Sequence, residues 1–141
     1  MSEPAIKGAV FDYDVVIRES LIDTLGHMNN AKYLELFEEA RWEIIAPRGF
    51  SVGEIMKNKI GPVILEVNLR FLKEVRLRQK IRIRSEVEAA SASSKTMTMT
   101  QTMLNESGEP CCVARFVFGL FDLKLRKLIL PTPEWLRAVG L

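Results

Sequence analysis

The residues best suited to chemistry lie between positions 23 and 33 of this chain of 141 residues. An acid, Asp23, precedes a glycine, Gly26, and the single histidine, His27. Two amides, Asn29 and Asn30, follow. Asparagine is a favoured N-cap residue, and the first N–H groups of a helix have no partner within it. A carboxylate near those donors can attack an acyl carbon or activate water, while the donors stabilise the developing oxyanion. We therefore expect the chemistry here.

Each of these residues also has a purely structural interpretation. Aspartate just before a glycine is common in turns, where its side chain bonds the backbone. Helix capping alone explains at least one of Asn29 and Asn30. Histidine titrates near neutrality, yet a lone histidine beside a helix start is more often a hydrogen-bonded structural residue. We interpret His27 as a pocket or positioning residue rather than as a residue that transfers a proton.

Two patterns place this polar segment between a strand and a helix. Apolar and polar residues alternate from Phe11 to Ile17, which predicts a strand with one wet face. A helical stripe of apolar residues follows over Ala31 to Ala46. Its members are Tyr33, Leu36, Phe37, Ala40 and Ile44, and Leu34, Trp42 and Ile45 broaden it. A helix this apolar is expected to be wrapped by a sheet. Pro47 and Gly49 end it.

The rest of the chain predicts a short helix, four strands and a closing helix. Ser51 and Glu54 form a capping-box pattern for the short helix, and Gly61-Pro62 then breaks the chain. The four predicted strands are residues 63–72, 81–89 and 96–103, which alternate, and residues 113–125, which are apolar on both sides over much of their length, as in a central strand. Turn-forming residues at Lys73-Glu74, at 92–95 and at 105–108 suit hairpins between consecutive strands. Pro133 suits the first turn of the last helix.

These elements predict an α+β fold, in which one antiparallel sheet curls around one long buried helix. Such a sheet has two edges, and the chain has little left to cover them. Pairing an edge with a second copy is the simplest remedy, so we predict at least a homodimer.

Composition narrows the class of protein. With 48% apolar residues, 27% charged residues and a formal charge of +2, we expect one globular domain over residues 1–141 and no nucleic-acid partner. We expect no membrane span and no secretory signal. Cys111 and Cys112 are strand neighbours that point to opposite faces, so a mutual disulfide is unfavourable. We expect a cytoplasmic location, no cofactor and no metal site, because one histidine offers no ligand cluster.

At this point the motif resembles a known family. The run Asp23-x-x-Gly26-His27-x-Asn29-Asn30-x-x-Tyr33, with Phe37-Glu38-x-Ala40-Arg41 after it, is similar to the signature of the 4-hydroxybenzoyl-CoA thioesterase branch of hotdog-fold proteins. That branch includes short-chain acyl-CoA thioesterases associated with the Tol–Pal system. The order of the predicted elements agrees over about residues 8–130.

The resemblance implies a hotdog fold, in which a five-stranded antiparallel sheet wraps a central helix. It also implies dimers with joined sheets, often paired into tetramers, with the thioester at the dimer interface. By resemblance, Asp23 is the nucleophile or general base, and the Asn30 N–H points at the thioester carbonyl. Substrate-binding positions carried over are Gly26, His27, Met28, Asn29 and Tyr33. Many relatives have a second acid two residues before the catalytic one, where this chain has Leu21.

The predicted function is therefore hydrolysis of an acyl thioester, either acyl-CoA or acyl-ACP. A hotdog dehydratase or hydratase is one alternative, but its relatives pair a histidine with an acid of the central helix, and no matching motif is present. A non-catalytic acyl-thioester-binding module is the other.

Further side chains around this site have provisional roles. Glu38 and Arg41 are spaced to pair along the helix, and Met97 or Met99 is a candidate for an acyl-pocket wall. A basic cluster over residues 70–84, from the end of the segment 63–72 into the segment 81–89, suits a wet strand face, and some members could hold coenzyme A phosphates. The cluster comprises Arg70, Lys73, Arg76, Arg78, Lys80, Arg82 and Arg84.

Overall fold

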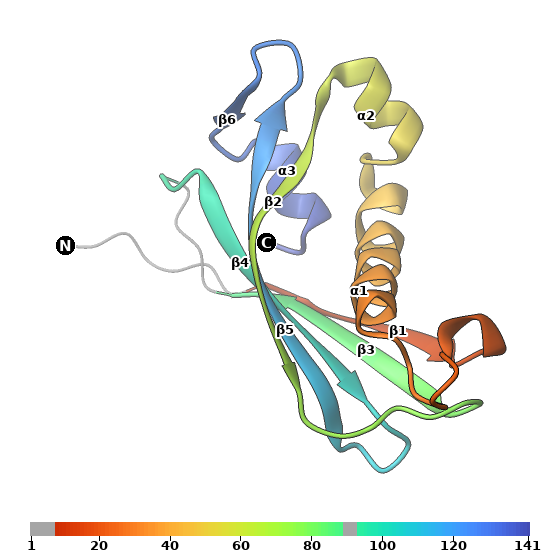
Figure 1. Ribbon diagram of the computed structural model, residues 1–141. Coiled ribbons are helices and arrows are strands. Elements are labelled where there is room, and N and C mark those ends of the chain that lie inside the picture. The colour runs from red at the N-terminus through yellow and green to blue at the C-terminus, as the bar shows by residue number, and fades with distance from the viewer. Residues whose placement is uncertain (1–7, 89–92) are drawn as a thin grey trace.

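The computed structural model describes residues 8–88 and 93–141 (Figure 1). Its helices and strands are, in chain order, β1 (Val10–Val16), α1 (Asn30–Ile45), α2 (Val52–Asn58), β2 (Ile60–Phe71), β3 (Lys80–Val87), β4 (Thr96–Leu104), β5 (Pro110–Asp122), β6 (Lys127–Ile129) and α3 (Pro133–Ala138). Short 3-10 turns cover Glu19–Leu21 and Ala46–Arg48. The predicted helices are confirmed, and β6 is an additional short strand. The predicted strand residue Ala89 and turn residue Ala92 lie outside the described residues.

The strands form one antiparallel sheet in the order β1-β3-β4-β5-β2, with β6 paired to β5. The predicted hairpin at Lys73-Glu74 is wrong, because β2 pairs with β5 while β3 lies between β1 and β4. Residues 72–79 are a crossing loop, anchored by the fully buried Val75. Turn-forming residues predict a change of direction, but they do not determine which strand is the next neighbour.

The predicted break at Gly61-Pro62 is also wrong. Both residues lie inside β2, where Gly61 pairs with Phe121 and Pro62 with Leu120 of β5. Proline cannot donate to a ladder, so it is tolerated in a strand that has a neighbour on one side only. Because β2 is an edge of the sheet, it meets this condition.

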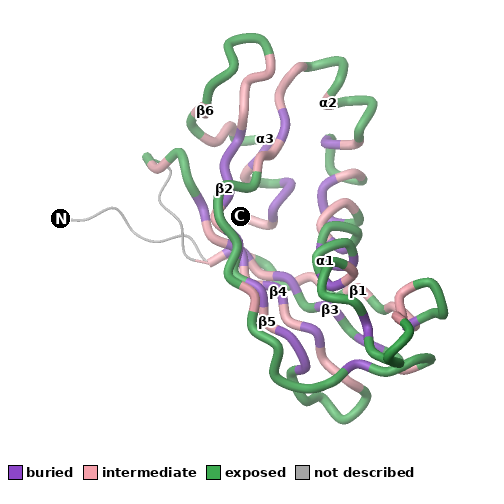
Figure 2. Tube along the Cα trace, in the orientation of Figure 1, coloured by how far each residue is buried: buried purple, intermediate pink, exposed green. Residues whose placement is uncertain are grey.

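The long helix α1 lies along one face of the curved sheet, and α2 lies beyond its end (Figure 1). Along β3, β4 and β5 buried residues alternate with more exposed ones, while α1 has a buried and an exposed side (Figure 2). The helix buries Tyr33, Leu36, Phe37, Ala40, Ile44 and Ile45. Leu34 is 38% exposed, so its predicted place in the buried stripe is wrong. The α+β architecture expected from the sequence is confirmed.

A polar network fixes the helix to the sheet at its centre. Gln101 of β4 is fully buried and donates from Nε2 to the Phe37 carbonyl at 3.0 Å and to the Ser85 hydroxyl at 2.9 Å. Arg41 donates to Gln101 Oε1 at 2.9 Å and lies 4.4 Å above the centre of the Phe116 ring. Arg41 therefore hydrogen-bonds the sheet rather than Glu38, whose charge nevertheless acts on it.

The two cysteines are neighbours within β5. Cys111 and Cys112 are both free and fully buried, as small core residues would be. Burial raises the pKa of the Cys112 thiol to about 12, so it is an inert packing group near neutral pH. Within the described part of the chain, no helix is both long and apolar enough to cross a bilayer.

Candidate active site

The polar segment that begins at Asp23 folds into a small hairpin before α1. Ile22 and Met28 form an isolated antiparallel bridge, and the Asp23 N–H donates to the His27 carbonyl at 2.9 Å. Gly26 turns the chain with φ of 81°, in the left-handed region that favours glycine. A side chain at position 26 would meet no steric clash, since nothing lies within 4 Å of a Cβ added there. Gly26 therefore serves the turn conformation rather than a close approach.

The Asp23 carboxylate is held on one side only. Its Oδ1 accepts from the Leu25 N–H at 2.9 Å and from the His27 N–H at 3.3 Å. No described residue donates to its Oδ2. One oxygen thus orients the group, while the other has lone pairs available for an acyl carbon or for a water proton. The structural interpretation of Asp23 as a turn residue is correct, and it is compatible with catalysis.

Helix α1 begins directly after this hairpin. Asn29 is the N-cap, and its Oδ1 accepts from the Ala31 N–H at 2.9 Å, a contact typically worth about 1 kcal/mol. Asn30 is the first helical residue and is exposed. Among the described residues, none accepts a hydrogen bond from the Asn30 N–H. This donor lies at the positive end of a helix of 16 residues, where negative charge is stabilised.

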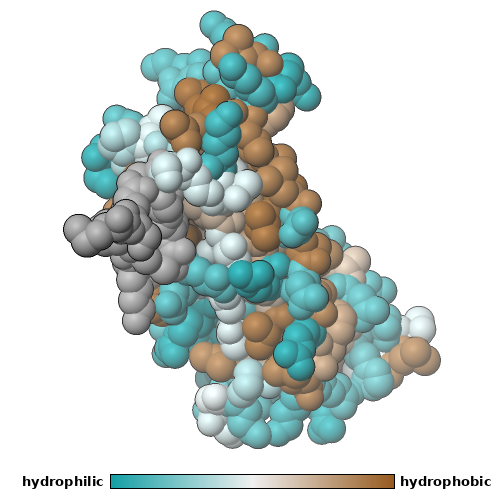
Figure 3. Space-filling view, turned by 90° about the vertical axis from the view of Figure 1, so that its left-hand side faces the viewer, coloured by the Kyte–Doolittle hydropathy of each residue, from teal (hydrophilic) through white to brown (hydrophobic). Residues whose placement is uncertain are grey.

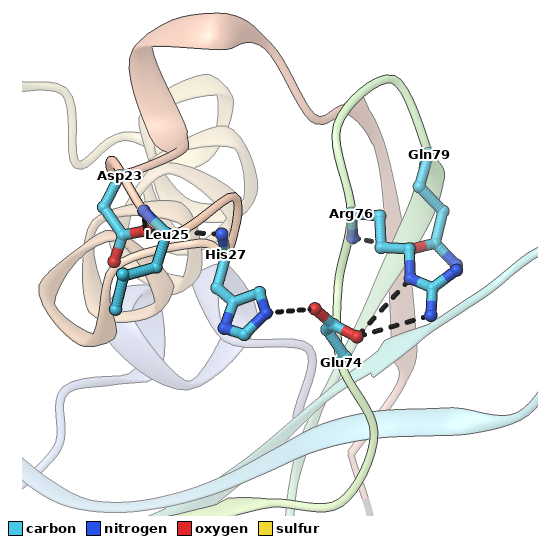
Figure 4. Close-up of polar contacts among 6 residues, drawn as sticks. All are labelled: Asp23, Leu25, His27, Glu74, Arg76 and Gln79. Atoms are coloured by element: carbon cyan, nitrogen blue, oxygen red, sulfur yellow. Dashed lines mark hydrogen bonds and ion pairs between the residues drawn. The ribbon is translucent and has the colours of Figure 1, made fainter.

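The His27 ring reaches across to another loop (Figure 4). Its Nε2 lies 2.6 Å from Oε1 of Glu74, in the crossing loop of residues 72–79. Glu74 Oε2 also accepts from Arg76 at 3.4 Å. His27 is therefore paired with a loop acid, not with an acid of α1 as a hotdog dehydratase would require.

Two of the predicted substrate-binding residues are buried. Met28 is 4% exposed and Tyr33 is 6% exposed, both within the same core cluster. The Tyr33 ring contacts Phe71 of β2 edge to face, with 5.0 Å between ring centres. Burial raises the pKa of the Tyr33 phenol, and neighbouring cysteines add to this. Both residues are therefore part of the hydrophobic core on which the hairpin and α1 pack.

Three cavities stand out, and Asp23, His27 and Asn30 line none of them. An apolar cavity of about 120 Å³ lies between the second half of α1, the strands β2, β4 and β5, and α3. Its lining residues are Glu38, Arg41, Trp42, Ile45, Pro62, Ile64, Met99, Phe116, Phe118, Trp135 and Val139. Met99, one of the two predicted pocket methionines, is among them.

The largest of these three cavities, about 790 Å³, is unrelated to the predicted site. It lies over β1, β3 and the β4–β5 turn, and its lining includes Arg82 and Arg84. Because Ile81 and Ile83 are buried, the alternation of a strand directs these two arginines to the face away from α1. We give this hollow no role in the chemistry.

Most members of the basic cluster are already paired with acids. Arg82 binds Asp14, Arg84 binds Asp12, Arg78 binds Glu19, Arg76 binds Glu74 and Lys73 binds Glu109. For Arg70 and Lys80, no ion pair is found among the described residues. The wet-face interpretation therefore accounts for most of the cluster. These two cations are the members with charge left for a phosphate.

Comparisons with known proteins define the class that this fold and hairpin belong to. A family model described as the thioesterase-like superfamily matches residues 16–139. The chain belongs to the thioesterase-like superfamily, and its fold is the hotdog fold.

Solved structures agree with this assignment. A Staphylococcus aureus protein solved in complex with CoA is 16% identical with a TM-score of 0.84, and the match covers 97% of this chain and 85% of that one. Escherichia coli YbaW, a probable thioesterase, is 25% identical with a TM-score of 0.76, covering 90% and 94%. DHNA-CoA thioesterase of S. aureus is 22% identical with a TM-score of 0.78, covering 92% and 87%. No curated protein sequence that was compared matches the chain.

Sequence reasoning missed two residues that organise this region. Glu74 was assigned to a hairpin turn, and Gln101 was one polar residue within a methionine and threonine strand. A buried glutamine among apolar side chains breaks the alternation of β4, and that break is a usable signal. Nothing in the sequence signals the contact between Glu74 and His27, because it joins two loops.

Proposed function

We propose that this protein hydrolyses acyl thioesters, with acyl-CoA as the first candidate substrate. Asp23 acts as nucleophile or general base, and the Asn30 N–H is the oxyanion donor. The observation that carries the proposal is the Asp23 carboxylate, whose Oδ1 is fixed by two backbone donors while its Oδ2 is available, just ahead of the exposed start of α1. Membership of the thioesterase-like superfamily supports the reaction class.

Two routes use the same arrangement. In one, Asp23 Oδ2 bonds to the thioester carbonyl carbon, the C–S bond breaks, and the thiolate leaves; water then hydrolyses the mixed anhydride. In the other, Asp23 takes a proton from water while the water oxygen attacks the carbonyl carbon; the C–S bond of the tetrahedral intermediate then breaks, and the leaving thiolate takes the proton back from Asp23. Both routes place negative charge on the carbonyl oxygen. A backbone donor at a helix start typically stabilises such charge by about 3 kcal/mol.

We further propose a homodimer joined through the β2 edge, with the active site completed by the second copy. β2 has a neighbour on one side only, and its exposed apolar residues are Ile64, Leu65, Val67 and Phe71, each at least 40% exposed. A band of hydrophobic surface is visible on the molecule in Figure 3. An exposed apolar edge strand favours pairing with another strand. Pairs of such dimers would give the tetramers of the 4-hydroxybenzoyl-CoA thioesterase branch, to which we assign the chain.

The apolar cavity beside α1 is our candidate for the acyl group. Pro62 and Ile64 of β2 line it, together with the aromatic side chains of Trp42, Phe116, Phe118 and Trp135. Because β2 is the proposed interface strand, the second copy of the chain would lie next to this cavity in the dimer. The S. aureus CoA complex and DHNA-CoA thioesterase support a CoA carrier, and acyl-ACP is the alternative carrier. The free, buried cysteines suit a reducing cytoplasm, where we place the reaction.

A thiol-release assay over short, medium, long and aromatic acyl-CoAs tests the function, with Asp23→Asn beside the wild type. Asparagine keeps the oxygen that accepts from Leu25 and His27, so the hairpin should persist while the nucleophile is lost. Asp122→Asn is a matched control, because Asp122 Oδ1 accepts from the Lys124 and Leu125 N–H groups at 2.9 Å in a similar turn. We expect near-complete loss of turnover in Asp23→Asn only. Full activity in that variant would remove the mechanism.

A further inference from the structure

The exposed tip of the hairpin that carries Asp23 is joined to a loop distant in sequence by an ion pair between two side chains. His27 Nε2 and Glu74 Oε1 are 2.6 Å apart, and Figure 4 shows the two side chains bridging the space between the loops. Both side chains are partly exposed, at 59% and 40%. A pair this exposed adds little to the stability of the fold. We therefore ask which groups of the hairpin this ion pair holds in position.

The loop of residues 72–79 is the firmly held side of this contact. Its Leu72 and Lys73 N–H groups donate to the Cys111 carbonyl at 2.8 and 3.0 Å, and Val75 is fully buried. The Arg76 N–H donates to Gln79 Oε1 at 3.0 Å, and the Arg78 N–H donates to the Ile17 carbonyl at 2.6 Å. The loop is thus anchored to β5, to the core and to the end of β1.

The Asp23 hairpin is held more weakly. Its exposed tip, residues 24–27, makes hydrogen bonds within the hairpin, and no described residue from another element donates to the Asp23 carboxylate. Movement of His27 would be passed directly to Asp23, because their backbones are joined by one hydrogen bond and the His27 N–H donates to Asp23 Oδ1. The ring contact with Glu74 is what links this tip to the anchored loop.

We propose that Glu74 is a positioning residue for Asp23 and acts through His27. Oε1 of Glu74 contacts Nε2 of the His27 ring, while Arg76 donates to Oε2 of the same carboxylate. The carboxylate is therefore held in place as an acceptor for the ring. The ring then fixes the backbone of His27, and that backbone fixes the catalytic carboxylate. This role rests on the proposed thioesterase function, and it makes His27 a link in positioning rather than a proton donor.

The test compares Glu74→Ala, His27→Ala and the double variant, with Glu106→Ala as control, since Glu106 is an exposed acid in the β4–β5 turn. Misplacing a catalytic group by about 1 Å can cost on the order of 100-fold, so we expect kcat to fall by roughly 10- to 100-fold in each single variant. KM should change by less than about twofold, since a positioning role alters the placement of Asp23 rather than the binding of substrate, whereas a rise in KM at constant kcat would assign the contact to substrate binding instead. The double variant should be no slower than the slower single variant. Glu74→Gln, which keeps an acceptor oxygen, should recover part of the loss.

A second readout is independent of turnover. His27 is the single histidine, so its ring signals in NMR spectra are unambiguous. In Glu74→Ala we expect the ring signals to shift and the Leu25 and His27 amide protons, which bond Asp23 Oδ1, to exchange faster. Wild-type kcat in both single variants, multiplicative losses in the double variant, or unchanged ring and amide signals would each overturn the positioning role. If Asp23→Asn is inactive while Glu74→Ala is fully active, only this inference fails. If Asp23→Asn is fully active, the proposed function fails instead.

Discussion

The oxyanion donor can be removed by a single substitution that respects the fold. Asn30 is the first residue of α1, and proline is favoured at that position because the N–H it lacks has no intrahelical partner. The preceding residue, Asn29, has φ of −63° and ψ of 141°, which is the extended conformation that a following proline requires. Asn30→Pro should therefore delete the N–H and leave helix and cap in place.

The expected size follows from the chemistry of that donor. Removal of one oxyanion donor typically costs about 3–4 kcal/mol of transition-state stabilisation, which is on the order of 100- to 1,000-fold in kcat. Asn30→Ala keeps the N–H and removes only an exposed side chain, so its kcat should stay within about threefold of wild type, as a change of about 0.6 kcal/mol would give.

The assay is steady-state thiol release from the best acyl-CoA, with thermal unfolding as a check on the fold. We expect Asn30→Pro to unfold within a few degrees of wild type, because the Asn30 N–H makes no hydrogen bond with residues 8–88 or 93–141 that the substitution would remove. Equal activity of the proline and alanine variants, with both folded, would refute the assignment of the Asn30 N–H. A large loss in Asn30→Ala would instead assign the role to the side chain.

Three further predictions concern stability and assembly. Gln101→Leu should lower the free energy of unfolding by about 2–4 kcal/mol in urea titrations, because it leaves the buried Ser85 hydroxyl and Arg41 without that partner; Thr98→Val on the other face of β4 should change it little. Burial and the Glu39 carboxylate raise the pKa of Tyr13 to about 12 from 10.0, so the folded state keeps this phenol protonated. That contribution is complete below pH 10 and is lost as the pH rises towards 12; Tyr13→Phe should show less alkaline destabilisation in pH-jump unfolding, and equal curves would contradict this. Val67→Lys should be a monomer by light scattering and should show little turnover in the thiol-release assay. Val10→Lys, on the opposite edge strand and similarly exposed, should stay a dimer.

Residues of the hairpin have a structural role and a proposed catalytic role at the same time. The same Asp23 oxygen that makes an ordinary turn also orients the carboxylate, and the same Asn29 that caps α1 also exposes the next N–H. Structural and catalytic interpretations therefore describe one arrangement. A substitution that tests catalysis must keep the turn and the cap, as Asp23→Asn and Asn30→Pro do.

Local patterns in the sequence were sufficient for the elements and for the position of the motif. The caps are short-range: Asn29 bonds Ala31, Ser51 and Glu54 form the predicted box, and Pro133 begins the last helix. Alternation predicted β1, β3 and β4, and a run that is apolar on both sides predicted β5, each to within a few residues. Successive side chains of a strand point to opposite faces, so burial of one face or of both leaves a local pattern in the sequence. The same short-range chemistry placed Asp23 just before the start of α1.

Strand order and the contacts between loops were decided only by the tertiary structure. The turn at Lys73-Glu74 could not reveal that β2 would pair with β5 at the edge, which also makes room for Pro62 inside a strand. Glu74 meets His27, and Gln101 meets Arg41, because the curved sheet brings together segments that no sequence period relates. Local propensity acts over a few residues, whereas these pairings are selected by the burial of a whole core, and that energy is shared by the entire chain.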